Sequence, residues 1–329
     1  MSAGTVLLVT DPAMAAHAAH GHPERPERMD AAAAGVEDGA ADGGARLERE
    51  RATAADAATL ERVHPASYVA ALDAAAARGG GWIDADTYLA PDSMQAARLA
   101  AGATVRAALA ATRGEVDVAF AIVRPPGHHA AAEHAGGFCL VNNVAVAAEA
   151  VRAAGLARRL AILDWDVHHG DGTQAIYGAD PDVCYASTHQ MPLFPGTGGA
   201  DERGSGAGEG SVHNAPLPPG AGDEAFLEAW RERLLPAIEA FRPEALLVSA
   251  GYDGHRDDPL AHLAITEHGY AALAADVGRL AHRLGLLGIA LTLEGGYDAD
   301  ALRASVAATV RGLLSGQLPA DERGERGAR

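Results

Sequence analysis

Short apolar runs alternate with longer amphipathic segments along most of the chain. The run VDVAFAIV at residues 116–123 is apolar on both faces, which is typical of a parallel strand covered by helices. Similar runs occupy residues 5–9, 160–165, 245–249 and 288–293, and helical patterns occupy residues 93–112, 144–154, 224–241 and 267–284. This alternation predicts an α/β fold with a doubly wound parallel sheet.

The remaining segments carry weaker patterns. Residues 30–77 have a helical pattern that is interrupted near Gly43–Gly44 and at VHPASY. Residues 196–210 are rich in glycine and predict a loop, and residues 318–329 predict a frayed tail. No internal repeat or linker is evident, so residues 1–329 are expected to form a single domain.

Charge and composition exclude some classes of function. The net charge of −18 argues against binding nucleic acid through its phosphates and favours cationic substrates. No apolar run approaches the ~20 residues of a membrane span, so no membrane attachment is expected. Cys139 and Cys184 lie in apolar contexts and are expected to be reduced, which favours a cytoplasmic location.

Four predicted strands are each followed by a polar cluster. These clusters are RPPGHH at 124–129, DWDVHHGD at 164–171, GYDGHRDDP at 251–259 and EGGYD at 294–298. Ligands of doubly wound sheets bind outside the carboxyl ends of the strands. The four clusters are therefore expected to meet in one site.

The cluster in ILDWDVHHGDGTQ, residues 162–174, carries the densest chemistry. Side chains of an extended segment repeat every two residues, so Asp164, Asp166 and His168 project to one side. Asp166 and His168 can then reach one ion. Asp164 stays behind them as an acceptor for another group.

A third ligand is expected from the cluster at 251–259, which offers Asp253, His255, Asp257 and Asp258. One carboxylate with Asp166 and His168 would leave coordination open for water and substrate, the pattern of catalytic zinc. Spacing alone does not decide which acid it is. One histidine with two carboxylates is also a hard ligand set, which suits Fe(II) or Mn(II).

The other two clusters offer proton transfer and hydrogen bonding. His128 and His129 are adjacent and suit paired proton handling, with Asp164 and Asp171 each orienting one imidazole. Tyr297 follows two glycines, and its O–H can stabilise a carbonyl oxygen that becomes an oxyanion. With a metal that lowers the pKa of water to about 7, these parts predict amide hydrolysis.

The motifs RPPGHH, GGFCLVNN, DWDVHHGDGTQ, LFPGTG, SAGYDGHRDDPLA and LEGGY occur in one order. From about Asp11 to Leu314 the chain resembles the histone deacetylase and acetylpolyamine amidohydrolase family, most closely its bacterial class II branch. The resemblance implies the arginase–deacetylase fold, a three-layer α/β/α sandwich with a mostly parallel sheet.

The resemblance also implies roles for individual residues. It makes His129 the general base, with His128 beside it, and it selects Asp258 as the third zinc ligand beside Asp166 and His168. Tyr297 becomes the group that polarises the carbonyl. The substrate tunnel would be lined by Gly137, Phe138 and Phe194, with Asp86 as a loosely matched rim acid, and a structural potassium ion would be held by Asp164, Asp166, His168, Ser187 and Thr188.

The function predicted on this basis is zinc-dependent removal of acetyl or similar acyl groups from acyl-lysine-type amines. An acetylpolyamine amidohydrolase is the alternative; the acidic balance favours it, and Leu260, where a polyamine-selective branch carries Glu, disfavours it. A non-catalytic acyl-lysine reader fits the intact ligands and Tyr297 poorly. A binuclear arginase-like hydrolase needs more bridging carboxylates than residues 166–169 offer.

Overall fold

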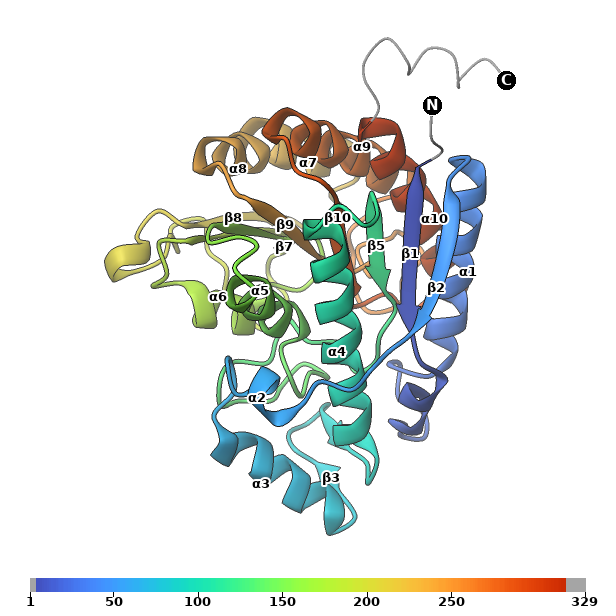
Figure 1. Ribbon diagram of the computed structural model, residues 1–329, viewed down its shortest axis with the longest axis vertical. Helices are drawn as coiled ribbons and strands as arrows, with labels where there is room; N and C mark the ends of the chain where they lie inside the picture. Colours follow the sequence, from blue (N-terminus) through green and yellow to red (C-terminus); the bar gives the residue numbers. More distant parts are fainter. Residues whose placement is uncertain (1–3, 318–329) are drawn as a thin grey trace.

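The computed structural model describes residues 4–317 and is built around one parallel sheet (Figure 1). Eight strands are hydrogen-bonded in the order β2-β1-β5-β10-β9-β6-β7-β8, and every pairing is parallel. The strands are β1 (Thr5–Thr10), β2 (Arg46–Arg51), β5 (Val118–Ala121), β6 (Leu160–Asp164), β7 (Val183–Gln190), β8 (Val212–Leu217), β9 (Ala245–Ala250) and β10 (Ile289–Leu293).

Helices cover both faces of this sheet. One face carries α4 (Ser93–Thr112) and α5 (Asn143–Ala153), and the other carries α1 (Glu27–Asp42), α9 (Glu267–Leu284) and α10 (Ala299–Gln317). The segment before β9 runs through α7 (Asp223–Glu228), η3 (Ala229–Leu234) and α8 (Leu235–Phe241). The shorter elements are η1 (Pro12–Ala16), α2 (Ala57–Leu60), α3 (Ala66–Ala77), α6 (Asp171–Tyr177), η2 (Gly206–Gly208) and the hairpin β3 (Gly81–Trp82) with β4 (Tyr88–Leu89).

The helices pack closely because their inward faces are small. Alanine supplies most of the buried positions of α4, and Gly312 of α10 lies so close to α9 that a Cβ would overlap the carbonyl of Ala271. Helix α9 is capped at its N-terminus by Thr266, whose side chain accepts the His268 N–H, and at its C-terminus by Gly285, which lies in the left-handed region at φ +71°. The buried core lies between these helices and the sheet.

Three strands differ from the expectation. Residues 46–51 form strand β2, although a helical pattern was predicted across 30–77, because RLERER is an exposed edge strand with no apolar face. Strands β7 and β8 were not predicted, since VCYASTHQ ends in polar residues and VHNAPL contains a proline that an edge position tolerates. The predicted tail, residues 318–329, lies outside the described residues, and the single-domain organisation stays a prediction.

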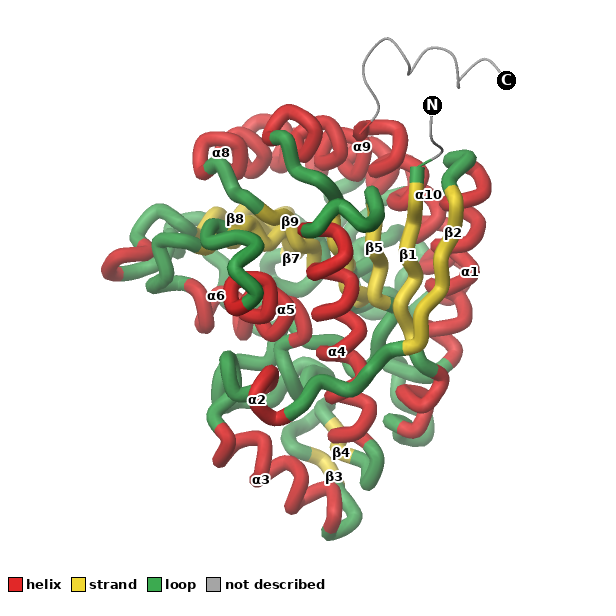
Figure 2. Tube along the Cα trace, viewed as in Figure 1, coloured by secondary structure: helices red, strands yellow, loops and turns green. Residues whose placement is uncertain are grey.

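The sheet order explains how the polar clusters meet. The four strands that carry them, β5, β10, β9 and β6, are consecutive neighbours at the centre of the sheet. Because all pairings are parallel, their carboxyl ends lie at one edge, towards which the arrowheads of β1 and β5 also point in Figure 1. The loops that leave these strands, drawn in green in Figure 2, carry the four polar clusters.

Candidate active site

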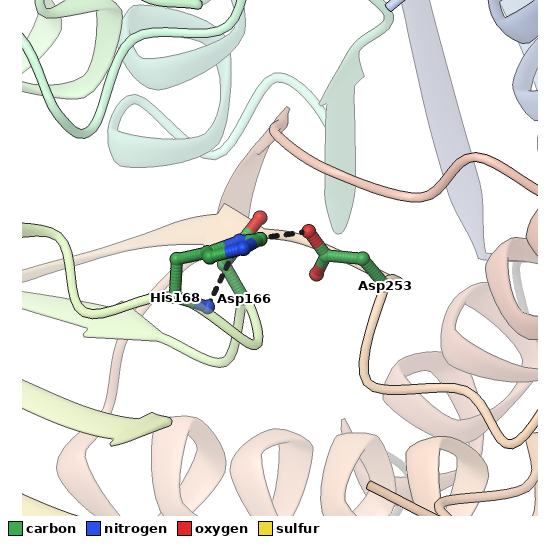
Figure 3. A group of neighbouring side chains, drawn as sticks. All are labelled: Asp166, His168 and Asp253. Carbon is green, nitrogen blue, oxygen red and sulfur yellow. Dashed lines mark hydrogen bonds and ion pairs between the residues drawn. The ribbon is translucent and has the colours of Figure 1, made fainter. Parts of the chain in front are cut away.

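A cluster of two carboxylates and one imidazole lies where β6 and β9 end (Figure 3). The Nδ1 atom of His168 is 3.1 Å from Oδ1 of Asp166 and 3.2 Å from Oδ2 of Asp253. Each of the three residues offers one ligand atom, and these three atoms all lie within 4.8 Å of one another. This separation lets all three atoms contact a single metal ion.

The surroundings of the cluster suit a cation. Within residues 4–317, the buried Oδ2 atom of Asp253 has no hydrogen-bond partner apart from its ion pair with His168. Burial alone would lower the pKa of His168, but Asp166 and Asp253 outweigh it and raise this pKa to about 10. Burial and the charge of Asp166 raise the pKa of Asp253. Two acids around one imidazole therefore create a negative field that a divalent ion would neutralise.

Asp258, the third ligand that the family resemblance implies, lies outside this three-residue cluster and next to Asp253. Its Oδ2 accepts the backbone N–H of Tyr297 at 2.6 Å, and its Oδ1 accepts that of Leu260 at 3.0 Å. Burial and the neighbouring Asp253 raise its pKa to about 7. Of the four groups in the 251–259 segment, the structure thus brings Asp253 to Asp166 and His168, and Asp258 fixes the turn around Tyr297.

Glycines make room for the two carboxylates. The backbone N–H of Gly295 donates to Oδ2 of Asp166 at 2.7 Å, and a Cβ at Gly295 would overlap Oδ2 of Asp253. A Cβ at Gly251 would likewise overlap the carboxylate of Asp166. The glycines in AGYD and EGGY therefore permit the close approach of backbone and carboxylates.

The adjacent histidines are each oriented by a carboxylate, as predicted. The Nδ1 atom of His128 lies 3.0 Å from Oδ2 of Asp164, and that of His129 lies 2.7 Å from Oδ1 of Asp171. Their ring centroids are 4.0 Å apart, and Nε2 of His128 is 3.8 Å from Asp166.

The two imidazoles have opposite protonation tendencies. Burial lowers the pKa of His129 to about 3, with the charge of His128 adding to the effect. Burial also disfavours a charge on His128, but Asp164 and Asp166 raise its pKa well above the usual range. A neutral His129 that donates from Nδ1 to Asp171 has a free lone pair on Nε2, which is the requirement for a base.

Tyr297 faces the same space. It follows Gly296, whose φ of +120° is a backbone conformation that glycine adopts readily and other residues rarely adopt. The centroid of the Tyr297 ring lies 4.8 Å from the guanidinium carbon of Arg28. Burial, with the charge of Asp253 next, raises the pKa of the phenol well above its usual range. The phenol therefore keeps its proton and can act as a hydrogen-bond donor.

A buried ion cluster that the sequence did not predict lies next to this tyrosine. The carboxylate of Glu24 lies 3.0 Å from Nη1 of Arg28 and 2.5 Å from Nε of Arg124, and all three side chains are inaccessible or nearly so. The Nε atom of Arg28 donates to the carbonyl of Gly296 at 2.5 Å. The sequence HPERPER does not by itself reveal the cluster, because only the tertiary fold places Arg124 opposite it.

A cavity of about 240 Å³ opens from these residues to the surface. The expected tunnel residues Asp86, Gly137, Phe138 and Phe194 line it, together with His128, His129, His168 and Tyr297. Phe194 is 48% exposed, and its ring meets that of His129 edge-on at 5.1 Å between centroids. The wall is completed by Pro126, Leu193, Leu260 and Gly295, none of which was predicted to line it.

Of the residues expected to hold potassium, Asp166 and His168 belong to the cluster, and Asp164, Ser187 and Thr188 lie outside it. Asp164 and Ser187 are paired on neighbouring strands β6 and β7. The Ser187 hydroxyl lies 2.9 Å from Nδ1 of His189, and Oγ1 of Thr188 accepts the Trp230 indole N–H at 3.0 Å. Asp164 itself is fully buried.

The sequence and the fold of this chain both match known proteins. A family model described as the histone deacetylase domain matches residues 22–313. The chain belongs to the histone deacetylase family. The family's crystal structure of the HDA15 HD domain superposes with a TM-score of 0.86 at 37% identity, covering 97% of this chain and 92% of that one. The arginase–deacetylase fold expected from the sequence is thereby confirmed.

Relatives within the family come from several kingdoms. A probable deacetylase of Archaeoglobus fulgidus is 44% identical over 72% of this chain and 66% of its own length. A histone deacetylase-like amidohydrolase of Pseudomonas aeruginosa is 42% identical over 77% of this chain and 67% of its length. Histone deacetylase 15 of Arabidopsis thaliana is 41% identical over 92% of this chain, which spans only 54% of that relative.

Proposed function

We propose that the chain is a metal-dependent deacetylase that removes acetyl or similar acyl groups from lysine-type amines. The observation that carries the proposal is the cluster of Asp166, His168 and Asp253, whose His168 lines the cavity beside two imidazoles that are each oriented by a carboxylate. The family membership agrees with this chemistry.

The residues of the chain divide the reaction among them. A bound Zn²⁺ would supply Lewis-acid polarisation of the scissile carbonyl and make water more acidic. His129, neutral and held by Asp171, would take the proton of the attacking water at Nε2. Tyr297 would donate its O–H to the oxygen that becomes an oxyanion, and His128 would hold a proton for the departing amine.

The metal we propose is Zn²⁺, held by Asp166, His168 and Asp253, the three groups that lie together in the structure. Asp258, the third ligand that the family resemblance implies, is the alternative. Two carboxylates and one imidazole also suit Fe²⁺, which is the second candidate. A structural K⁺ near Asp164 and Ser187 remains part of the proposal, supported by a buried carboxylate beside a hydroxyl on the neighbouring strand.

The cavity favours an acyl-lysine arm over an acetylated polyamine. Leu260 lines it and offers no carboxylate to a second ammonium group. Acetylpolyamine hydrolysis is nevertheless the second candidate, because Asp86 stands in the cavity wall and the chain carries a net charge of −18. A non-catalytic reader would have no use for the paired imidazoles.

No helix in the described part of the chain has the length and apolar character of a membrane span. Cys139 and Cys184 are buried free thiols, as expected. We propose a cytoplasmic location on the basis of these reduced cysteines. On the basis of the net negative charge, we also propose that the protein does not bind nucleic acid.

Turnover of a substrate panel tests the proposal. Zinc-loaded protein is assayed with acetyl-lysine peptides, acetylputrescine and acetylspermidine, and released acetate is measured. Hydrolysis of the peptides with a higher kcat/KM than that of the polyamines is expected. Binding of the peptides without turnover would contradict the proposed enzyme and favour the reader.

A further inference from the structure

Glu294 is a buried acid that the reaction outlined above does not use. It directly follows β10, between the ends of β5 and β9, and its side chain is completely buried. It does not line the cavity, so it does not touch substrate. The carboxylate nevertheless lies next to the catalytic groups.

Both oxygens of this carboxylate bind neighbouring strand ends. Oε2 accepts the backbone N–H of Gly127 at 2.7 Å and that of His128 at 3.2 Å. Oε1 accepts the hydroxyl of Ser249, on β9, at 3.1 Å. The side chain therefore connects the loop that carries the histidines to the strand that leads to Asp253.

The loop packs closely on α5, so a small movement of its backbone would displace the side chains it carries. Gly127 is wedged against α5, where a Cβ would lie 2.5 Å from the backbone nitrogen of Asn143. Without Glu294, two buried N–H groups would have no carboxylate acceptor, and a buried donor without a partner is costly. The loop would shift to find one, and the His128 imidazole would shift with it.

We infer that Glu294 is a positioning residue for His128, acting by accepting two backbone N–H groups of the Gly127–His128 turn. The inference rests on the proposed function, because it assigns His128 to proton transfer. It predicts that hydrogen-bond acceptance at position 294 sets the rate of the chemical step. Substrate binding should depend on it little.

The variants Glu294→Ala, Glu294→Gln and Ser249→Ala test this inference. The glutamine keeps an oxygen that can accept the two N–H groups, whereas the alanine removes it. For Glu294→Ala, kcat should fall about 100-fold with KM within about twofold, the size expected from a displacement near 1 Å. Glu294→Gln should restore kcat to within about fivefold of the unsubstituted enzyme.

A readout independent of turnover comes from ¹H NMR of the imidazole N–H protons in metal-free, histidine-labelled protein. The chemical shift of the His128 N–H proton that faces Asp164 should change in Glu294→Ala. The His129 N–H proton that faces Asp171 is the internal control, and its chemical shift should not change. This readout holds even if the unsubstituted protein fails to turn over substrate, which would count against the proposed function alone.

Three results would overturn the inference. They are an unchanged kcat and His128 resonance in Glu294→Ala, a glutamine variant as slow as the alanine variant, and movement of both histidine resonances together. If Glu294→Ala does not fold, Ser249→Ala removes one anchor of the same carboxylate. It should lower kcat about fivefold, and no change there would also overturn the inference.

Discussion

The Nδ1 atom of His168 lies 3.2 Å from Oδ2 of Asp253, although 85 positions separate the two residues in the chain. Strand β6 delivers the histidine and its neighbour β9 delivers the acid. Their proximity, with Asp166 completing the cluster, places three groups at the strand ends that could hold a metal ion.

Replacing Asp253 should remove the metal, and replacing Asp258 should not. Asp253→Asn is expected to weaken Zn²⁺ binding about 100-fold or more, because it deletes a ligand oxygen from the cluster. Asp258→Asn, the matched control, should stay within about tenfold, since that carboxylate binds backbone N–H groups. Metal content after dialysis measures both, and the reverse ranking would restore Asp258 as the ligand.

Adding a methyl group at Gly137 should disturb the base. Gly137 has φ +54°, and a Cβ there would overlap the ring of His129. Gly137→Ala is expected to lower kcat about 100-fold by displacing the imidazole. Gly136→Ala is the control, because its Cβ would have no neighbour closer than 3.6 Å, and its kcat should stay near that of the parent. Equal activities in the two variants would contradict the placement of His129.

A carboxylate at position 260 should shift substrate preference. Leu260 lines the cavity, so Leu260→Glu would offer an ion pair to the second ammonium group of an acetylated polyamine. A partly exposed pair contributes about 1 kcal/mol, which corresponds to roughly a fivefold gain in kcat/KM for acetylspermidine relative to an acetyl-lysine peptide. Leu260→Gln controls for polarity without charge. A gain of equal size with glutamine would exclude the ion pair as the cause.

His17 should make the fold sensitive to mild acid. Burial, with smaller contributions from Arg124 and His22, lowers its pKa to about 4, although the charge of Glu24 acts in the opposite direction. The unfolded chain therefore binds a proton between about pH 6.5 and 4 that the folded chain does not, and stability falls as the pH drops through that window.

Denaturant unfolding measures this effect of His17. The parent protein should lose about 2 kcal/mol more than His17→Gln between pH 7 and pH 5. His268→Gln, at an exposed surface position, is the control and should follow the parent. Identical pH dependence in the parent and in His17→Gln would show that this imidazole is not buried in its neutral form.

The sequence allowed prediction of the central strands and of the meeting of their polar ends, because apolar runs covered on both faces leave a clear pattern. The edge strands were missed, since residues such as those of RLERER have no face to bury. The third ligand could not be selected by spacing. Asp253 and Asp258 are five positions apart in one loop, and only the turn that Asp258 forms with Tyr297 separates their roles. The ion pair of Glu24 with Arg124 could not be predicted either, because only the fold brings these distant residues together.

Metal dependence of hydrolysis tests the central claim most directly. The initial rate of acetate release from an acetyl-lysine peptide is measured before chelation, after chelation and after Zn²⁺ is returned. The site formed by Asp166, His168 and Asp253 predicts complete loss of the rate on chelation and its recovery with about one Zn²⁺ per chain. A rate that survives removal of all metal would contradict the account.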